Sequence, residues 1–182
     1  MRSATFFISA RVLPLLIIPL LTACEEPMVA SASRKTATMS CASGTEGPFR
    51  VAHVSDADTI VVRVPGSKPV TVRLIGVDSP EIDGPYRRAE PGGVEAQQFV
   101  RSMLADSEVY LEMDPAQGSH DKYRRRLAYV YRTKDCLFVN GEIIRQGHGR
   151  NYRKFRFRHR ELFENYEREA RMNRRGMWDT SP

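Results

Sequence analysis

The strongest constraint on the fold is a series of short β-prone runs separated by turn-forming residues. Residues 49–53 and 60–64 are rich in Val, Ile and Phe, and the polar break 55–58 lies between them. Residues 65–68, with the sequence PGSK, form a second turn cluster ahead of a third run at 70–75. Val and Ile favour strands, whereas Pro, Gly, Ser and Asp favour the turns between them. The pattern predicts three consecutive antiparallel strands.

A long loop, a helix and two further strands are expected next. Residues 78–93 contain several Pro and Gly residues and predict a loop whose length is typical of functional segments. Apolar residues at helical spacing predict a helix over 94–105. Alternating apolar residues predict strands over 109–113 and 127–131.

Two more helices are expected in the C-terminal third. Asn140 is a candidate N-cap for a short helix that ends before Gly147, and apolar residues recur on one face of 159–173. Five short strands with a helix between the third and fourth predict an α+β fold. The expected architecture is a five-stranded OB-type Greek-key β-barrel with about three helices, which often binds oligonucleotides. Fold alone does not establish function.

The N-terminal residues have the composition of an export signal. An apolar run at 12–21 follows two arginines and is shorter than the ~20 residues that span a bilayer. The sequence LTAC at 21–24 resembles the lipobox of bacterial lipoproteins, in which the cysteine, here Cys24, is acylated. We therefore expect residues 1–23 to be a signal peptide. An ordinary signal peptide with a chance cysteine is the alternative.

The next segment is predicted to tether the folded domain. Residues 24–46 are rich in Ser, Ala and Thr without apolar periodicity, and the domain is expected to cover 47–179. The protein would be exported, either as a bacterial cell-envelope lipoprotein or in secreted form. If Cys24 is lipidated, Cys41 and Cys136 are the remaining thiols, and we expect them to form a disulfide in an oxidising compartment.

The formal net charge of +6 favours an anionic partner. Charge alone leaves nucleic acid, acidic polysaccharide and anionic membrane open. The three cysteines lack the paired short spacing of a zinc site.

Four acidic residues follow the ends of predicted strands. Asp56 and Asp58 lie in the break after the first strand, and Asp78 and Glu81 follow the third. In a meander these strand ends share one edge, so the carboxylates are expected to converge. Clustered carboxylates repel one another unless a hard cation neutralises them, which predicts calcium or magnesium rather than zinc. Asp-rich turns that merely cap local structure are the alternative.

Arginines accompany this acidic cluster. Arg73 lies inside the third strand, where a charge needs a partner, and residues 124–126 form an arginine triplet ahead of the fifth strand. Guanidinium groups beside a cation suit a phosphodiester, because they bind its oxygens bidentately. A solvated arginine face is the alternative for the triplet.

These motifs together resemble the staphylococcal-nuclease-like family, also called thermonucleases. The resemblance is carried by SDADTIVV, VRLIGVDSPE, GVEAQQF, DKYRRRLAYVY, VNGEIIRQG and GMW, and it extends over residues 49–178. It implies a calcium-dependent endonuclease that hydrolyses phosphodiesters of DNA and RNA, prefers single strands and leaves 3′-phosphate products.

The resemblance also implies a metal site. Asp58 and Asp78 match its calcium-binding carboxylates, and Ser79 stands where the family offers a backbone carbonyl. Asp56 matches an acidic neighbour that helps to set the charge of the site.

Further roles follow for the groups around the substrate. Glu81 matches the glutamate that activates or orients water, and Arg73 and Arg125 match the arginines that bind the scissile phosphate. Lys122 and Tyr123 match residues that contact a terminal phosphate.

The resemblance implies further substrate contacts, and the sequence departs from the family pattern at two positions. Tyr152 lies in the region of tyrosines that stack on a base, and the basic stretch 150–160 fits a path for the strand, with a solvated or lipid-facing surface as the alternative. Ala57 and Arg124 replace family glycines. The second replacement raises the question of which arginine faces the metal, and the spacing from Asp121 and Leu127 favours Arg125.

Two other classes of function remain open. A catalytically inactive nucleic-acid-binding OB module would bind the same partners, single-stranded DNA and RNA, without cleaving them. A structural envelope lipoprotein would use the barrel as a spacer. We expect a monomer, attached to the membrane through its N-terminal lipid.

Overall fold

The computed structural model describes residues 41, 43–84 and 88–179. By contacts between Cα atoms the chain divides into Met1–Thr36 and Ala37–Pro182, and the described fold belongs to the second unit. The predicted signal peptide, the Cys24 lipidation site and all but the last residues of the predicted tether lie outside the described residues.

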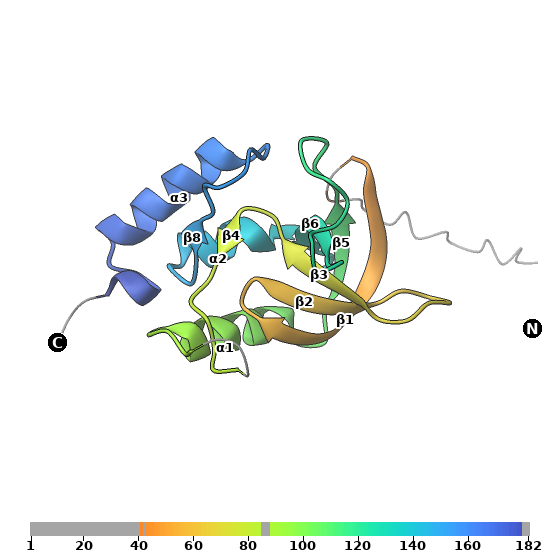
Figure 1. The fold of residues 1–182 in the computed structure, drawn as a ribbon, viewed down its shortest axis with the longest axis horizontal. Coiled ribbons are helices and arrows are strands. Elements are labelled where there is room, and N and C mark those ends of the chain that lie inside the picture. The colour runs from red at the N-terminus through yellow and green to blue at the C-terminus, as the bar shows by residue number, and fades with distance from the viewer. Residues whose placement is uncertain (1–40, 42, 85–87, 180–182) are drawn as a thin grey trace, which may run out of the picture. The chain divides into compact units, whose positions relative to one another are not determined.

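The described chain forms a closed barrel with three α-helices (Figure 1). The barrel strands are β1 (Thr45–Asp56), β2 (Thr59–Arg63), β3 (Val70–Leu74), β5 (Glu108–Glu112) and β6 (Arg126–Arg132). Three short strands are β4 (Val77–Asp78), β7 (Leu137–Phe138) and β8 (Arg150–Asn151). The helices are α1 (Gly93–Leu104), α2 (Val139–Arg145), α3 (Arg160–Met172) and the 3-10 turn η1 (Gly176–Trp178).

The sheet closes through one parallel pair. Its strands run in the order β3-β2-β1-β5-β6-β7, and β3 also pairs with β6, with Arg73 opposite Leu127. The other barrel pairs are antiparallel. A closed barrel leaves no free edge between these strands. The five-stranded mixed barrel and three helices confirm the predicted OB-type α+β fold.

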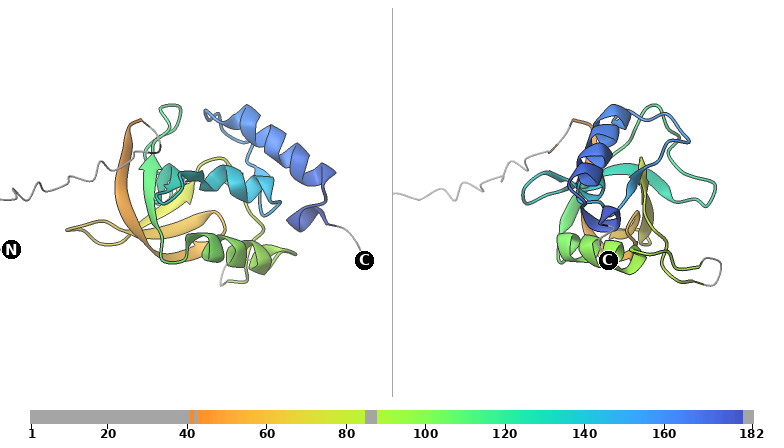
Figure 2. Two further views of the ribbon diagram at one scale, coloured as in Figure 1. Left: turned by 180° about the vertical axis from the view of Figure 1, so that it is seen from behind. Right: turned by 90° about the vertical axis from the view of Figure 1, so that its left-hand side faces the viewer.

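Apolar residues of the strands and helices share one core. Ile60, Val62, Val72, Leu74 and Val130 are fully or almost fully buried inside the barrel. The helix α1 packs against β1, and α2 contacts both β6 and α3 (Figures 1 and 2). The barrel and the C-terminal helices are therefore one packed body rather than a barrel with appendages.

Gly76 sets the connection between β3 and β4. Its φ is +77°, and a Cβ there would lie 2.7 Å from ring atoms of both Phe157 and Phe163. Only glycine accommodates both the backbone and the contact. The chain can therefore turn out of the barrel at this point and bring β4 beside β8.

Asn140 does not cap α2, contrary to the prediction. The helix begins at Val139, and the buried Asn140 amide instead accepts the N–H of Val130 at 2.9 Å and donates to the carbonyls of Ile75 (2.9 Å) and Ala128 (3.3 Å). It satisfies backbone groups of two chain segments, which a short-range sequence pattern does not reveal.

The folded region begins earlier than the predicted boundary at residue 47. β1 starts at Thr45, and Cys41 is joined by a disulfide to Cys136 in the turn between β6 and β7, the pairing expected from the sequence. The chain is thereby fixed to the barrel ahead of its first strand. Within the described ranges, no helix has the length and apolar character to cross a bilayer.

Candidate active site

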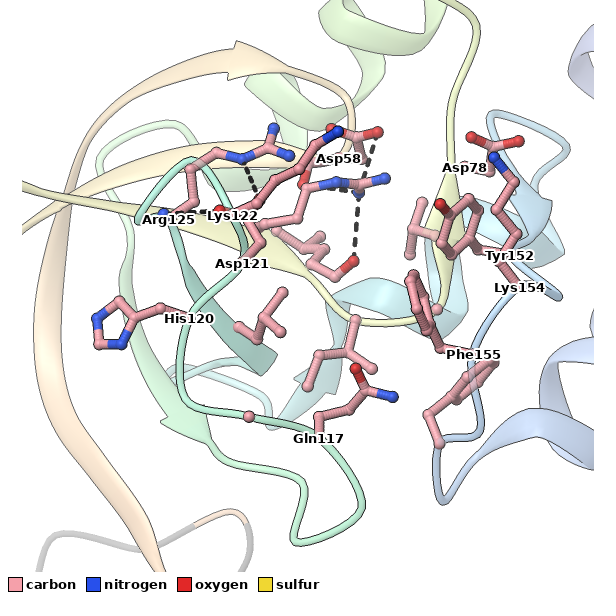
Figure 3. A pocket seen from close by; sticks show the side chains of 18 of the residues that line it. Asp58, Asp78, Gln117, His120, Asp121, Lys122, Arg125, Tyr152, Lys154 and Phe155 are labelled. Atoms are coloured by element: carbon pink, nitrogen blue, oxygen red, sulfur yellow. Dashed lines mark hydrogen bonds and ion pairs between the residues drawn. The ribbon is translucent and has the colours of Figure 1, made fainter.

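A pocket of about 930 Å³ brings together most of the predicted site residues. It is lined by Asp58, Arg73, Asp78, Glu81, Lys122, Tyr123, Arg125 and Tyr152. Ser79 and Asp56 are not part of this lining. Asp58, Lys122 and Arg125 occupy one side of the pocket, and Asp78 and Tyr152 the other (Figure 3).

Arg73 and Asp58 form an ion pair in one wall of the pocket, where Asp58 is buried and Arg73 is half-buried. The antiparallel register of β2 and β3 places Arg73 opposite Thr59, the residue after Asp58. Its Nη1 lies 3.0 Å from Asp58 Oδ2 and also donates to the carbonyls of Asp58 and Leu74, both at 3.3 Å. The charged residue within the strand therefore has the partners that burial requires.

Arg125 is held in the pocket by Asp121. The Oδ2 of Asp121 accepts Arg125 Nε at 2.7 Å, and its Oδ1 accepts the backbone N–H of Arg125 at 2.9 Å. Burial on its own raises the pKa of Asp121, but the bonds from Arg125 outweigh this and lower it. A charged carboxylate thus orients the guanidinium. No sequence motif had indicated this role for Asp121.

The two arginines are linked through one hydroxyl. Arg125 Nη1 donates to Thr59 Oγ1 at 3.3 Å, and Thr59 Oγ1 donates to Asp58 Oδ1 at 2.7 Å. Asp58 in turn pairs with Arg73. Thr59 therefore fixes both guanidinium groups relative to the same carboxylate, a role that no sequence motif had indicated.

The two departures from family glycines have different structural consequences. Arg124 has a φ of +62° and an exposed side chain, so it occupies the backbone conformation that glycine prefers while Arg125 lines the pocket. Ala57 is buried, and it is not among the described residues with positive φ. Alanine therefore introduces no such strain there.

Two carboxyl groups at this site, those of Asp56 and Asp78, have a raised pKa. Burial, followed by the charge of Asp58, raises the pKa of Asp56 to about 6, and Glu81 adds to the effect. Burial also raises the pKa of Asp78, with Arg73 opposing and Asp58 adding to the increase. Carboxylate oxygens are ligands that fit a hard cation such as Ca²⁺.

The carboxylates do not form a compact ligand cage. Among the described residues, no group of three or more His, Cys, Asp or Glu side chains has the geometry to hold a metal ion. Ser79 is buried, and its hydroxyl has no hydrogen-bond partner in the described part of the chain. The acidic side chains thus affect one another's pKa, as expected for groups that lie near one another, but they do not form a closed set of metal ligands.

Aromatic and basic side chains form the outer part of the pocket. Tyr123 and Phe155 are 62% and 58% exposed, which is unusual for large rings and leaves their faces open to a ligand. The Nζ of Lys122 lies 4.9 Å from the centroid of the Tyr123 ring, and the Tyr152 and Phe155 ring centroids are 5.9 Å apart. These groups can stack on bases and bind phosphates.

Several lining residues were not singled out from the sequence. Gln117, His120 and Lys154 line the pocket, and Phe155 appeared only within the basic stretch 150–160 (Figure 3). For Lys154 and Phe155, the aromatic residues that lie between basic ones in this stretch are a usable sequence signal. Gln117 and His120 lie in a polar loop with no motif, so the sequence held no signal for them.

Comparison with known proteins points to one family. The family model described as "Staphylococcal nuclease homologue" matches residues 71–180. A thermonuclease of Staphylococcus hyicus is 32% identical over 152 residues, which cover 83% of this chain and 86% of that protein.

Two other relatives agree with this match. A thermonuclease of Staphylococcus intermedius is 34% identical over 132 residues, covering 72% of this chain and 76% of that protein. A protein of Haemophilus influenzae described as an uncharacterized endonuclease is 27% identical over 145 residues, covering 79% of this chain and 74% of its own length.

Proposed function

Because this chain belongs to the staphylococcal nuclease family and is a nuclease, we propose that it is a calcium-dependent phosphodiesterase acting on single-stranded DNA and RNA. The observation that carries the proposal is the linked pair of Arg73 and Arg125 in a pocket that Glu81 also lines. Two fixed guanidinium groups and a carboxylate in one pocket suit a phosphodiester and an attacking water.

The cation site is proposed from the same pocket. Asp58 and Asp78, with the backbone carbonyl of Ser79, would hold Ca²⁺, and Asp56 would add negative charge nearby. When bound, the ion supplies Lewis-acid polarisation of the phosphoryl group. The raised pKa of Asp56 and of Asp78, caused first by burial and then by the neighbouring charge of Asp58 and other groups, is compatible with this assignment, because a bound cation would favour their charged forms.

The proposed reaction is an in-line displacement at phosphorus. Glu81 accepts a proton from water as the water oxygen forms its bond to phosphorus. The bond from phosphorus to the 5′ oxygen breaks, and that oxygen takes a proton from solvent, leaving a 3′-phosphate. Arg73 and Arg125 donate to the non-bridging oxygens, where negative charge accumulates in the transition state.

The outer pocket supports the proposed substrate class. Tyr152 and Phe155 would stack on bases, and Lys122 and Tyr123 would contact a terminal phosphate. Stacking and phosphate contacts do not depend on base identity or on the sugar, so both DNA and RNA strands are suitable. Bases must be unpaired to stack on the rings, which favours single strands.

The proposed location is outside the cytoplasm. The signal-like residues 1–23 and the cysteine at position 24 support export and lipid attachment. The Cys41–Cys136 disulfide is consistent with an oxidising compartment. Mass spectrometry of the mature protein tests the anchor: an acylated N-terminal Cys24 is expected, and an N-terminus at Glu25 or beyond would refute it. We also propose a monomer.

An activity assay separates the proposed enzyme from a binding module. Labelled single-stranded DNA is incubated with the protein in Ca²⁺, and then with a calcium chelator. The proposal predicts cleavage to 3′-phosphate ends in Ca²⁺ and loss of cleavage in chelator. Tight binding without cleavage in Ca²⁺ would instead support the catalytically inactive OB module.

A further inference from the structure

A second basic hollow lies outside the catalytic pocket. It has a volume of about 630 Å³ and is lined by β1, the end of β2 and the C-terminal part of α1. Arg50, Arg63 and Arg101 contribute to its lining, together with His53. None of these four side chains lines the catalytic pocket. We call this hollow the arginine hollow.

Its positive charge is poorly compensated. Arg50 and Arg63 are directly opposite one another in the β1–β2 register, and like charges in that position destabilise a sheet. Within the described residues, Arg63 and Arg101 have no ion-pair partner. Arg50 has one, Asp106 at 3.5 Å, but that carboxylate is 94% exposed and screened by water.

The placement of these three arginines therefore destabilises the fold without a structural benefit. All three arginines are exposed, so they do not support the core. Three guanidinium groups around one hollow match phosphate oxygens in charge and in hydrogen-bonding geometry. The chemistry of the site therefore suits a phosphate-bearing polyanion.

The hollow is within reach of a strand bound at the catalytic pocket. Asp58 and Arg63 are separated along β2 by about 17 Å at strand rise. The helix α1 begins at Gly93, where an added Cβ would collide with the Glu81 carbonyl oxygen, and it reaches Arg101 after about 12 Å. β2 therefore leads from beside Asp58 of the pocket to Arg63 of the hollow, and α1 leads from beside Glu81 to Arg101.

We propose that the arginine hollow is an exosite that binds backbone phosphates of the nucleic-acid strand beyond its catalytic segment. Strands occupy OB folds over roughly 4–16 nucleotides, so a long strand can contact both sites and a short one only the pocket. The exosite deepens the proposed function by making affinity depend on strand length.

The test removes two arginines and compares substrates of different length. The Arg63→Ala/Arg101→Ala double variant is matched with Arg168→Ala/Arg174→Ala, which removes the same charge from exposed positions on and just after α3. Binding of a labelled 24-nucleotide oligothymidylate is measured by anisotropy in chelator, across a salt series. In Ca²⁺, the kcat/KM of a small thymidine phosphodiester is measured for each protein.

The exosite predicts about tenfold weaker binding of the 24-mer by the first variant and little change in the control. The slope of log affinity against log salt should fall by about 1.4, since each lost phosphate contact on a single strand contributes ~0.7. The kcat/KM of the small phosphodiester should stay at the wild-type value.

Equal weakening in both double variants would overturn the proposal, because the effect would then reflect net charge. Unchanged 24-mer binding by the Arg63→Ala/Arg101→Ala variant would also overturn the proposal. If that variant lost only its binding to phosphatidylglycerol vesicles, the hollow would be assigned to a membrane surface instead. The binding measurement requires no hydrolysis, so its failure is distinguishable from failure of the proposed nuclease activity.

Discussion

Arg73 Nη1 lies 3.0 Å from Asp58 Oδ2, and the same nitrogen donates to the Asp58 carbonyl oxygen. The guanidinium proposed to bind phosphate and the carboxylate proposed to bind calcium are therefore in direct contact. A change in either residue is expected to affect both proposed sites.

Arg73→Lys should lower kcat by about 10²–10³-fold, the usual effect of removing one transition-state donor. An ammonium keeps the charge but cannot reproduce the guanidinium fork. Initial rates on single-stranded DNA in saturating Ca²⁺ measure the effect. Arg126→Lys is the matched control, because Arg126 pairs with Glu46 and does not line the pocket. Equal loss in both variants would contradict the assigned role.

Asp121→Asn should reduce activity through Arg125 rather than through the metal site. Asparagine cannot provide a charged acceptor to Arg125 Nε, so the guanidinium loses its orientation. We expect kcat to fall by at least about tenfold and by no more than the ~10²–10³-fold cost of losing the donor itself. Calcium affinity, measured by calorimetry, should stay near the wild-type value.

Asp135→Asn provides the control for this change, because Asp135 also accepts an arginine Nε, that of Arg132, and it does not line the pocket. It should leave kcat unchanged. A large loss of calcium affinity in Asp121→Asn would show that the carboxylate acts on the metal site instead.

Much of the barrel could be predicted from local pattern. β-branched runs separated by Pro, Gly and Asp clusters indicated the five strands, and the charge of Arg73 within a strand indicated a buried partner. The turn after β3 was harder to predict, because the need for Gly76 arises from aromatic rings of residues more than 80 positions later in the chain.

The less predictable parts of the site depend on tertiary contacts. The spacing from Asp121 and Leu127 favoured Arg125 over Arg124, but the positive φ of Arg124 that accompanies this arrangement is not signalled by an arginine in sequence. Asp121 and Thr59 act by holding Arg125, and such contacts leave no periodicity or spacing to recognise. Asn140 was misread as a cap for the same reason.

Asp114→Asn should destabilise the fold by about 1–3 kcal/mol at neutral pH, the cost of disrupting a buried hydrogen-bonded acceptor. The buried carboxylate accepts Tyr129 Oη at 2.5 Å and the N–H groups of Arg158 (2.8 Å) and Ala116 (2.9 Å). Burial on its own raises the pKa of Asp114, but these bonds outweigh it and lower the pKa.

The sign of the pH dependence follows from that lowered pKa. The stabilising contribution of the Asp114 carboxylate is complete above its unfolded-state pKa of about 3.9, and it is lost as pH falls through the folded-state pKa. The difference in Tm between the wild-type protein and Asp114→Asn should therefore be largest near neutral pH and shrink below about pH 4. A difference that grows toward acid pH would contradict this account.

Cys41→Ser/Cys136→Ser should lower stability without altering chemistry. The disulfide spans 95 residues of sequence, and closing a loop of that size contributes up to about 4–5 kcal/mol in the chain-entropy model. Neither cysteine lines the catalytic pocket. Chemical denaturation should show the loss, while kcat at a temperature where both proteins are folded should remain the same. An equal fall in kcat would mean that the bridge positions the site.

The central claim is that Glu81 activates water beside two phosphate-binding arginines, and Glu81→Gln tests it most directly. The substitution keeps the shape of the side chain and removes its capacity to accept a proton. Glu95→Gln, on the exposed surface of α1, is the matched control. Single-turnover cleavage of single-stranded DNA in saturating Ca²⁺ is the measurement. We predict a rate at least about 10²–10⁴-fold lower in Glu81→Gln, the typical contribution of a general base, with strand binding retained and Glu95→Gln unchanged. Cleavage by Glu81→Gln at the wild-type rate would contradict the account.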